Sequence, residues 1–169
     1  KQGDIDTAAE MARAANSGLI VGLGGGSALD TAQLVACCAV SGLSATAYAL
    51  CATPLPKRRL PIIAITTTAG TGSEVTRVSV YANAEGDKVW AWGEDLKPDV
   101  AILDPELTVG VPPHITAATG LDALVHAIEA YASPVYHPPA DALALEGTRQ
   151  LTRWLPVALA SPTDREAQR

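Results

Sequence analysis

The sequence predicts an α/β domain built on a parallel sheet, followed by a region of helices alone. Short, uniformly apolar runs recur up to Asp104, as in strands that are buried on both faces of a parallel sheet. Two of these runs end in turns rich in glycine or threonine, and Ala-rich segments lie between them. Beyond Pro112-Pro113 only helical periodicity remains, so we expect a second, all-α region there.

The first elements alternate between helix and strand. A helix is predicted over Asp4 to Asn16, and Ser17-Gly18 ends it. The apolar run from Leu19 to Leu23 is typical of a buried strand, and Gly24-Gly25-Gly26 forms a turn directly after it.

The helix after this glycine turn has recognisable ends. Ser27 stands where an N-cap is expected, and Asp30 follows three residues later as the partner of a capping box. An Ala-rich segment then runs to Val40, and Ser41-Gly42 ends it. A second Ala-rich helix is expected over Ala45 to Ala52.

The remaining strands are expected before the helical region. Pro61 to Thr66 is a buried-strand candidate that leads into a polar turn, Thr67 to Glu74. β-Rich residues at Val78–Tyr81 and Lys88–Trp92 flank another polar turn, which predicts a hairpin. Asp99 to Asp104 is the last expected strand.

A domain boundary is predicted after residue 107, which gives a first region of residues 1–107 and a second of residues 108–169. Helices are predicted in the second region over Gly120 to Ala132 and over Ala140 to about Arg153. The first of them is expected to pack through one apolar side, made of Leu121, Leu124, Val125 and Ile128.

Composition and charge limit the classes of function. The 169 residues (17.4 kDa) are 48% hydrophobic and 18% charged, which indicates a globular fold and excludes a disordered or collagen-like chain. The net charge is −6 and no window gathers many basic residues, so nucleic acid is not an expected partner. The uncharged stretch between Asp30 and Lys57 is long enough to span a bilayer, but Ala, Ser, Gly and Thr make it too weakly apolar, and no membrane span is expected.

Cysteine usage favours a reducing compartment. The three cysteines, of which Cys37 and Cys38 are adjacent, fit neither a disulfide framework nor a CxxC metal site. The chain begins at Lys1 and lacks the basic and apolar segments of a secretory signal. We therefore expect a piece of a longer cytoplasmic protein.

The glycine turn is the first candidate site. A strand, three glycines and a helix N-terminus let backbone N–H groups approach an anion such as a pyrophosphate. The spacing is not the standard G-x-G-x-x-G, because Ser27 stands where the third glycine would fall. A tight strand-to-helix turn capped by Ser27 is the structural alternative, so the turn alone leaves phosphate binding open.

Hydroxyl groups follow the second buried strand. Thr66-Thr67-Thr68 and Thr71-Gly72-Ser73 lie where open α/β sheets bind ligands, although an ordinary polar turn has the same composition. Both turns follow strands of one predicted parallel sheet, so we expect them at the same edge.

A carboxylate and an imidazole stand four residues apart in the helical region. On a helix, Asp122 and His126 lie one turn apart on the same face and can share a cation. The pair suits Fe²⁺ or Zn²⁺ better than Mg²⁺, although a surface hydrogen bond is the commoner use of this spacing. The other histidines, His114 and His137, lie in Pro-flanked segments whose spacing suggests no ligand.

Four segments, in this order, resemble the iron-containing, group III alcohol dehydrogenase family. They are Gly24 to Asp30, Ala64 to Thr76, Pro98 to Leu107 and Ala117 to Glu129. The resemblance covers most of residues 18–150, and the last two segments are highly specific.

The resemblance implies a dehydroquinate synthase-like fold, in which an incomplete α/β dinucleotide-binding domain is followed by the start of an all-α metal-binding domain. It also implies NAD(P) and a divalent metal, Fe²⁺ or Zn²⁺, as cofactors. The implied cofactor-binding residues are Gly25, Gly26, Ser27 and Asp30 of the pyrophosphate turn, Thr67 and Thr68, and Lys88. The implied metal ligands are Asp122 and His126.

The sequence departs from the family pattern at several points. Family members complete the metal site with two histidines well downstream, which do not fall within these 169 residues. The family's first strands, and an acidic residue that helps to select NAD over NADP, are likewise absent. Thr66 replaces the usual proline, and Gln33 stands where a lysine is common. We therefore expect an internal fragment of a considerably longer protein.

The predicted function is reversible hydride transfer between a small alcohol and the corresponding aldehyde or ketone, with the metal as a Lewis acid on the substrate oxygen. A homo-oligomer is implied for the complete protein, and the 169-residue chain alone is expected to be inactive. One alternative is an enzyme like glycerol dehydrogenase or maleylacetate reductase; Asp122 with His126 disfavours the metal-free reductase. A truncated, non-catalytic remnant is the other alternative.

Overall fold

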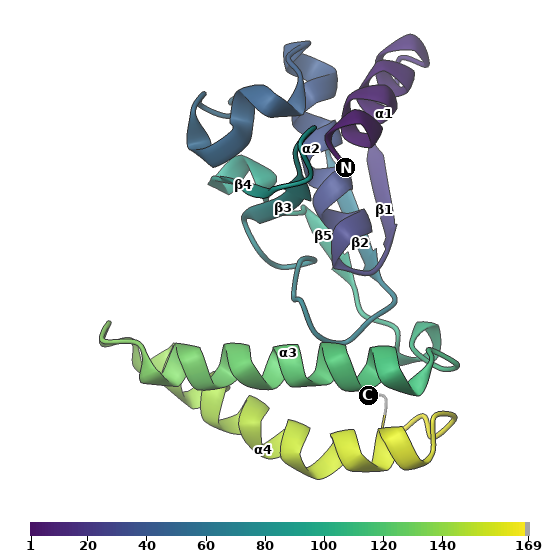
Figure 1. The fold of residues 1–169 in the computed structure, drawn as a ribbon, viewed down its shortest axis with the longest axis vertical. Helices are drawn as coiled ribbons and strands as arrows, with labels where there is room; N and C mark the ends of the chain where they lie inside the picture. Colours follow the sequence, from purple (N-terminus) through teal and green to yellow (C-terminus); the bar gives the residue numbers. More distant parts are fainter. Residues whose placement is uncertain (168–169) are drawn as a thin grey trace. The chain divides into compact units, whose positions relative to one another are not determined.

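The computed structural model describes residues 1–167 and divides into two compact units (Figure 1). The first comprises Lys1–Thr66 and Ser73–Leu103; the second comprises Thr67–Gly72 and the chain from Asp104 onward. The loop after the second buried strand thus groups with the helical unit. The domain boundary after residue 107 stays a prediction for the complete protein.

The first unit contains a three-stranded parallel sheet, which confirms the fold class that the apolar runs predict. Its strands are β1 (Ile20–Gly24), β2 (Ile62–Thr66) and β5 (Val100–Ile102), in the order β1-β2-β5. Gly24 pairs with Thr66 in the register, so β1 and β2 end level with each other. The glycine turn and the threonine segment therefore leave the same edge of the sheet, as expected.

Two α-helices build the core of this unit, in which α2 (Gly26–Ser41) packs on β1 and β2, and α1 (Gln2–Ala14) packs on α2. An added Cβ at Gly22 of β1 would lie 2.8 Å from the Cβ of Ala32, so this glycine allows α2 to approach the strand. Helix α2 ends at Gly42, whose φ of 72° is a left-handed conformation that glycine adopts without strain.

One face of the sheet is uncovered by the residues that the structure describes. Side chains alternate between the faces, and α2 covers the face that includes Gly22. The opposite face presents exposed apolar side chains, which are Val21, Leu23, Val100 and Ile102. Parallel sheets are ordinarily covered on both faces.

The second Ala-rich helix that the sequence predicts is not an α-helix. Ala45–Cys51 forms a 3-10 helix, η1, which is interrupted at Ala49 and Leu50. A segment this short has little helical stability of its own, so tertiary contacts set its conformation. The backbone N–H of Ala45 donates to the carboxylate of Asp6 (2.7 Å), and the Tyr81 hydroxyl donates to the carbonyl of Ala45 (2.7 Å).

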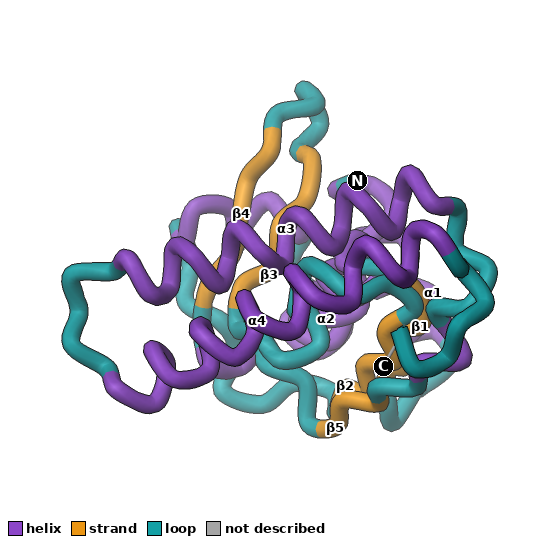
Figure 2. Tube along the Cα trace, turned by 90° about the horizontal axis from the view of Figure 1, so that it is seen from below, coloured by secondary structure: helices purple, strands orange, loops and turns teal. Residues whose placement is uncertain are grey.

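The predicted hairpin is present as β3 (Val78–Ala82) and β4 (Lys88–Trp92), which Figure 2 shows as an extended pair of strands. Its inner face packs on α2 and η1 through buried residues, which are Ser79, Tyr81, Val89 and Ala91. Its outer face carries exposed apolar side chains, which are Val80, Trp90 and Trp92. A short 3-10 helix, η2 (Glu94–Leu96), then leads toward β5.

The second unit is a helical hairpin preceded by the 3-10 helix η3 (Pro105–Leu107). Helix α3 (Pro113–Ala132) packs along α4 (Pro138–Ala160), and both helices are longer than the sequence predicts. Within α4, Pro156 does not end the helix. The helices approach closely at Gly120, where an added Cβ would lie 2.5 Å from Cδ1 of Leu155.

The expected packing side of α3 is wrong. Leu121, Val125 and Ile128 are exposed and Leu124 is half-buried, while Gly120 is buried against α4 and Ala127 faces Gly147. Small residues spaced along one side allow two helices to approach closely, and this contact places the larger apolar side chains on the opposite side of α3.

Taken one at a time, none of the helices within residues 1–167 is long and apolar enough to cross a membrane. Helices α2 and η1 meet the length and composition criteria only together, with a bend of 118° between them.

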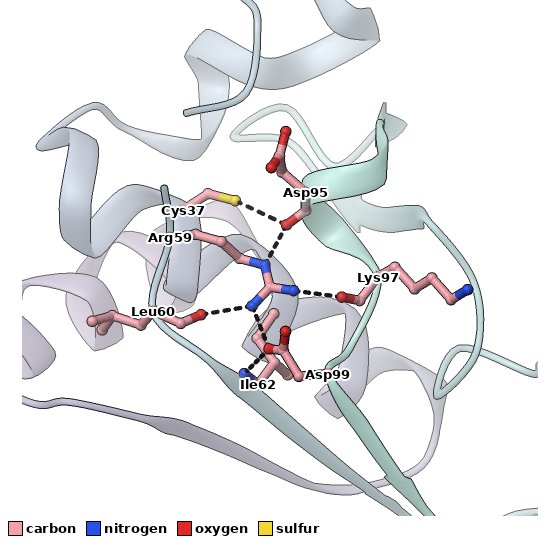
Figure 3. A network of polar contacts seen from close by, with 7 residues as sticks. All are labelled: Cys37, Arg59, Leu60, Ile62, Asp95, Lys97 and Asp99. Atoms are coloured by element: carbon pink, nitrogen blue, oxygen red, sulfur yellow. Dashed lines mark hydrogen bonds and ion pairs between the residues drawn. The ribbon is translucent and has the colours of Figure 1, made fainter. Parts of the chain in front are cut away.

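A largely buried arginine side chain connects the start of β2 to the start of β5 (Figure 3). The Arg59 side chain is 12% exposed and donates to the Asp99 carboxylate (2.6 Å). It also donates to the backbone carbonyls of Leu60 (2.9 Å), Asp95 (2.6 Å) and Lys97 (2.6 Å). Asp99 in turn accepts from the backbone N–H of Ile62 (2.7 Å), and the hydrogen bond from Arg59 lowers the pKa of this carboxyl.

Replacing Arg59 by lysine should destabilise the fold by about 2 kcal/mol, because an ammonium group cannot reach all the acceptors of the planar guanidinium. Urea denaturation measures the loss, and Arg58→Lys is the matched control, since Arg58 is exposed. Because the pKa of Asp99 is lowered, its stabilising contribution is present above the ordinary value of about 3.9 and is lost as the pH falls below it. Equal losses for the two variants would contradict the role given to Arg59.

Candidate functional site

The glycine turn opens directly onto the N-terminus of α2. The N-cap is Gly25, and no side chain caps the helix, so the expectation that Ser27 is the N-cap is wrong. Ser27 lies inside the first turn and is exposed. Of the turn glycines, Gly24 has positive φ (146°), and an added Cβ there would lie 2.8 Å from the Cβ of Ala28. The helix thus offers uncapped backbone N–H groups, which favour an anion.

Asp30 has a different partner from the one that the capping box predicts. Its side chain is 8% exposed, and one carboxylate oxygen accepts from the backbone N–H of Val80 (3.1 Å). The Ser79 hydroxyl donates to the backbone carbonyl of Asp30 (2.8 Å). Asp30 therefore joins α2 to strand β3, because the hairpin brings N–H and hydroxyl donors to this helix. Its contact with a cofactor stays a prediction.

Asp30→Asn should keep the fold at neutral pH, because the amide oxygen can still accept from Val80. Burial raises the pKa of Asp30, so its favourable contribution is complete below the ordinary value of about 3.9 and is lost as the pH rises through the raised pKa. The stability of Asp30→Asn relative to the parent should therefore increase between pH 4 and pH 7 in urea denaturation.

Asp30→Ala is the control for this prediction. It removes the acceptor and should be less stable than Asp30→Asn by about 1–2 kcal/mol at either pH, since neither variant keeps the titratable group. An Asn variant as unstable as the Ala variant at pH 7 would contradict this account of Asp30.

The structural role of Gln33, a second buried polar residue on α2, was not predicted from the sequence. Gln33 is fully buried, and its amide N–H donates to the carbonyl of Ser73 (2.8 Å), the residue at which the chain returns to the first unit. The signal for it is a glutamine within an otherwise apolar, Ala-rich helix. Gln33 thereby fixes the backbone of Ser73 to α2 within the first unit.

The threonine loop, Thr67–Gly72, packs against α3 within the second unit. An added Cβ at Gly70 would lie 2.5 Å from the backbone oxygen of Thr119, one turn before Asp122. Only glycine permits this approach, because backbone atoms of α3 cannot rotate away as a side chain can. A cavity of about 660 Å³ opens between Ala69 of the loop, α3 and α4. Thr67 and Thr68 are half-buried, and their role as nucleotide contacts stays a prediction.

Asp122 and His126 lie one turn apart on α3, as the spacing requires. Both are exposed, and among residues 1–167 neither takes part in an ion pair, so they are accessible to a ligand. A carboxylate and an imidazole form a donor set that fits Fe²⁺ or Zn²⁺. The described residues contain no group of three or more His, Cys, Asp or Glu side chains that would hold a metal. This part of the chain therefore supplies at most two ligands.

The other histidines do not join this pair. His137 caps α4, because its Nδ1 accepts from the backbone N–H of Ala140 (3.1 Å). His114 is exposed in the first turn of α3.

Lys88 begins β4 on the outer face of the hairpin. It is exposed and lies opposite Ala82 in the register. Among residues 1–167 it forms no ion pair, so its charge is available to an anion. The contact of Lys88 with a cofactor stays a prediction.

Two family profiles match this chain. The profile described as iron-containing alcohol dehydrogenase matches residues 1–105, and the profile described as Fe-containing alcohol dehydrogenase family, C-terminal, matches residues 116–169.

Curated relatives are similar over almost the whole chain. Long-chain-alcohol dehydrogenase 1 of Geobacillus thermodenitrificans is 47% identical over 165 residues, which are 96% of this chain and 42% of the relative. NAD-dependent methanol dehydrogenase of Bacillus methanolicus is 42% identical over 90% of this chain and 40% of the relative. The chain thus spans about two fifths of the length of these relatives.

Solved structures share the fold. Sulfoacetaldehyde reductase from Bifidobacterium kashiwanohense, solved in complex with NAD+, superposes with a TM-score of 0.96 and 41% identity over 99% of this chain and 45% of that one. A 1,3-propanediol oxidoreductase superposes with a TM-score of 0.93 and 36% identity over 99% of this chain and 44% of that one.

Proposed function

The chain belongs to the iron-containing alcohol dehydrogenase family, and from this membership we propose that the complete protein transfers hydride reversibly between a small alcohol and NAD(P). The product of oxidation is the corresponding aldehyde or ketone. The observation that carries the proposal is that an uncapped, glycine-lined helix N-terminus and an accessible carboxylate–imidazole pair occur in one chain.

The first unit holds the dinucleotide in this proposal. Gly25, Gly26 and Ser27 offer backbone N–H groups to the pyrophosphate, whose negative charge the N-terminus of α2 stabilises. The missing side chains of the two glycines let the phosphates come close to the backbone. Thr67 and Thr68 add hydroxyl groups, and Lys88 adds a positive charge.

The second unit binds the metal through Asp122 and His126. When bound, Fe²⁺ or Zn²⁺ acts as a Lewis acid that polarises the substrate oxygen and favours the alkoxide. The carboxylate of Asp122 and the imidazole of His126 would hold the ion, and further protein ligands would be needed beside these two to complete its site.

The proposal also covers the cellular compartment and the oligomeric state of the complete protein. We place it in the cytoplasm as a homo-oligomer that acts on a small alcohol or aldehyde. Support for a reducing compartment comes from Cys37 and Cys38, which are buried as free thiols. Burial raises the pKa of both thiols to about 12, so they remain protonated and unreactive at neutral pH.

The experiment is turnover by the complete protein with NAD+ and a series of short primary alcohols, followed by the absorbance of the NADH formed. We expect activity that a chelator removes and that Fe²⁺ or Zn²⁺ restores. Turnover that is indifferent to chelation would instead favour an enzyme of the metal-free reductase type. A folded protein that binds neither NAD+ nor metal would show a non-catalytic remnant.

A further inference from the structure

The outer face of the β3–β4 hairpin exposes large apolar side chains that the proposed function does not yet use. Val80 is 41% exposed, Trp90 50% and Trp92 56%. The inner face of the same hairpin is buried against α2 and η1, so the strands are held in place. Exposed aromatic rings on a fixed surface are typical of a binding site.

The hairpin that carries this face is anchored to α2 near its N-terminus. The Ser79 hydroxyl and the Val80 N–H both donate to Asp30, which lies one turn into α2 from its N-terminus. Val80 is the cross-strand partner of Trp90 in the antiparallel register. The hydrogen bonds therefore fix the strand that pairs with Trp90 to α2, one turn after the helix end that receives the pyrophosphate in the proposed function.

The chemistry of the face suits one occupant. Lys88 lies two residues before Trp90 and therefore on the same face of the hairpin. An indole ring next to an ammonium group complements a planar heteroaromatic ring that a ribose joins to a phosphate. The second tryptophan differs, because the Arg77 guanidinium already lies 5.2 Å from the Trp92 ring centroid and is ion-paired with Glu94.

We propose that Trp90 stacks on one of the two planar rings of the dinucleotide and so contributes to the affinity for the cofactor. Val80 extends the apolar surface beside the indole, and Lys88 stabilises the negative charge of the phosphates. The inference rests on the proposed function, since it requires NAD(P) at the glycine turn.

The test is the dissociation constant of NAD+ for the complete protein, measured by calorimetry. Trp90→Ala should raise the Kd roughly tenfold, in keeping with the cost of removing a ring that stacks on a base. Trp90→Phe should restore most of the affinity, because it keeps an aromatic face. Trp92→Ala is the matched control, from the same strand and face, and should change the Kd by less than about twofold.

Tryptophan emission gives a second readout that does not depend on turnover. NAD+ does not absorb where tryptophan emits, so quenching of emission by NAD+ reports contact with the ring. We expect the parent and Trp92→Phe to show this quenching and Trp90→Phe to lose most of it. Separate titrations with nicotinamide mononucleotide and ADP-ribose identify the ring, because Trp90→Ala should weaken the half that carries it.

The outcomes separate the inference from the function on which it rests. If the parent binds NAD+ and Trp90→Ala binds it equally well, the stacking role is wrong and the proposed function stands. An unchanged Kd together with a lower oligomeric mass for Trp90→Ala would show that the face packs against a second copy, and would also overturn the inference. A folded parent that does not bind NAD+ would overturn both.

Discussion

His126→Ala in the complete protein should abolish metal-dependent turnover and leave the affinity for NAD+ within a few-fold of the parent. Loss of a direct ligand should cost at least the 10–100-fold that changes around a metal site typically cost. The fold should tolerate the substitution, because His126 is exposed and surface substitutions usually change stability by less than about 0.5 kcal/mol. The glycine turn belongs to the other unit of the chain, so cofactor binding should persist.

Metal analysis, a melting curve and an NAD+ titration together check this result. His114→Ala is the matched control, since His114 is exposed on the same helix but lies two turns before Asp122. The control should keep its metal content and its turnover. A His126→Ala variant that melts normally, retains its metal and turns over alcohol would rule out the ligand assignment.

Ser27→Asp should move stability and cofactor affinity in opposite directions. A carboxylate in the first turn of a helix interacts favourably with the helix dipole, so α2 should gain about 0.3–1 kcal/mol. The same negative charge would face the pyrophosphate. At a separation of about 5–6 Å and an effective dielectric constant of about 20, the repulsion is about 3 kcal/mol, which corresponds to a roughly hundredfold rise in the Kd for NAD+.

Two further variants isolate the effect of the charge. Ser27→Asn has nearly the size of aspartate without its charge, so it should keep most of the affinity. Ser27→Ala should also change affinity little, because the backbone N–H groups remain. If Asp and Asn at this position weaken NAD+ binding equally, the loss is steric and no anion lies at this helix end.

Local features were accessible from the sequence because they depend on neighbours within a few residues. The apolar runs and the glycine after each helix or strand predict β1, β2, the hairpin and the end of α2 at Gly42. The spacing of Asp122 and His126 requires that they share one side of any helix that includes both. Recognition of the family likewise depended on short, ordered motifs and needed no coordinates.

The predictions from sequence were wrong where the hydrogen-bond partner lies in a segment that is distant along the chain. The Asp30 carboxylate accepts from Val80, fifty residues further along, in place of closing a capping box with Ser27. The Ala-rich segment at 45–51 is a 3-10 helix interrupted at Ala49 and Leu50, and Asp6 and Tyr81 hold its first residue, Ala45. A single hydrogen bond contributes only about 1 kcal/mol, so several partners compete and only the folded chain decides between them.

By itself, then, the sequence determined the order of the elements, the two turns at one sheet edge and the spacing of the candidate ligands. The tertiary structure decided which side of α3 is buried, which loop packs on it at Gly70, and that strand β3, which pairs with Trp90, is anchored to Asp30 of α2. The physical reason is that helices and turns are fixed by bonds and periodicity within one or two turns of chain. Packing depends instead on which surfaces fit at close range, such as Gly120 against Leu155, and a linear pattern of apolar residues does not contain that information.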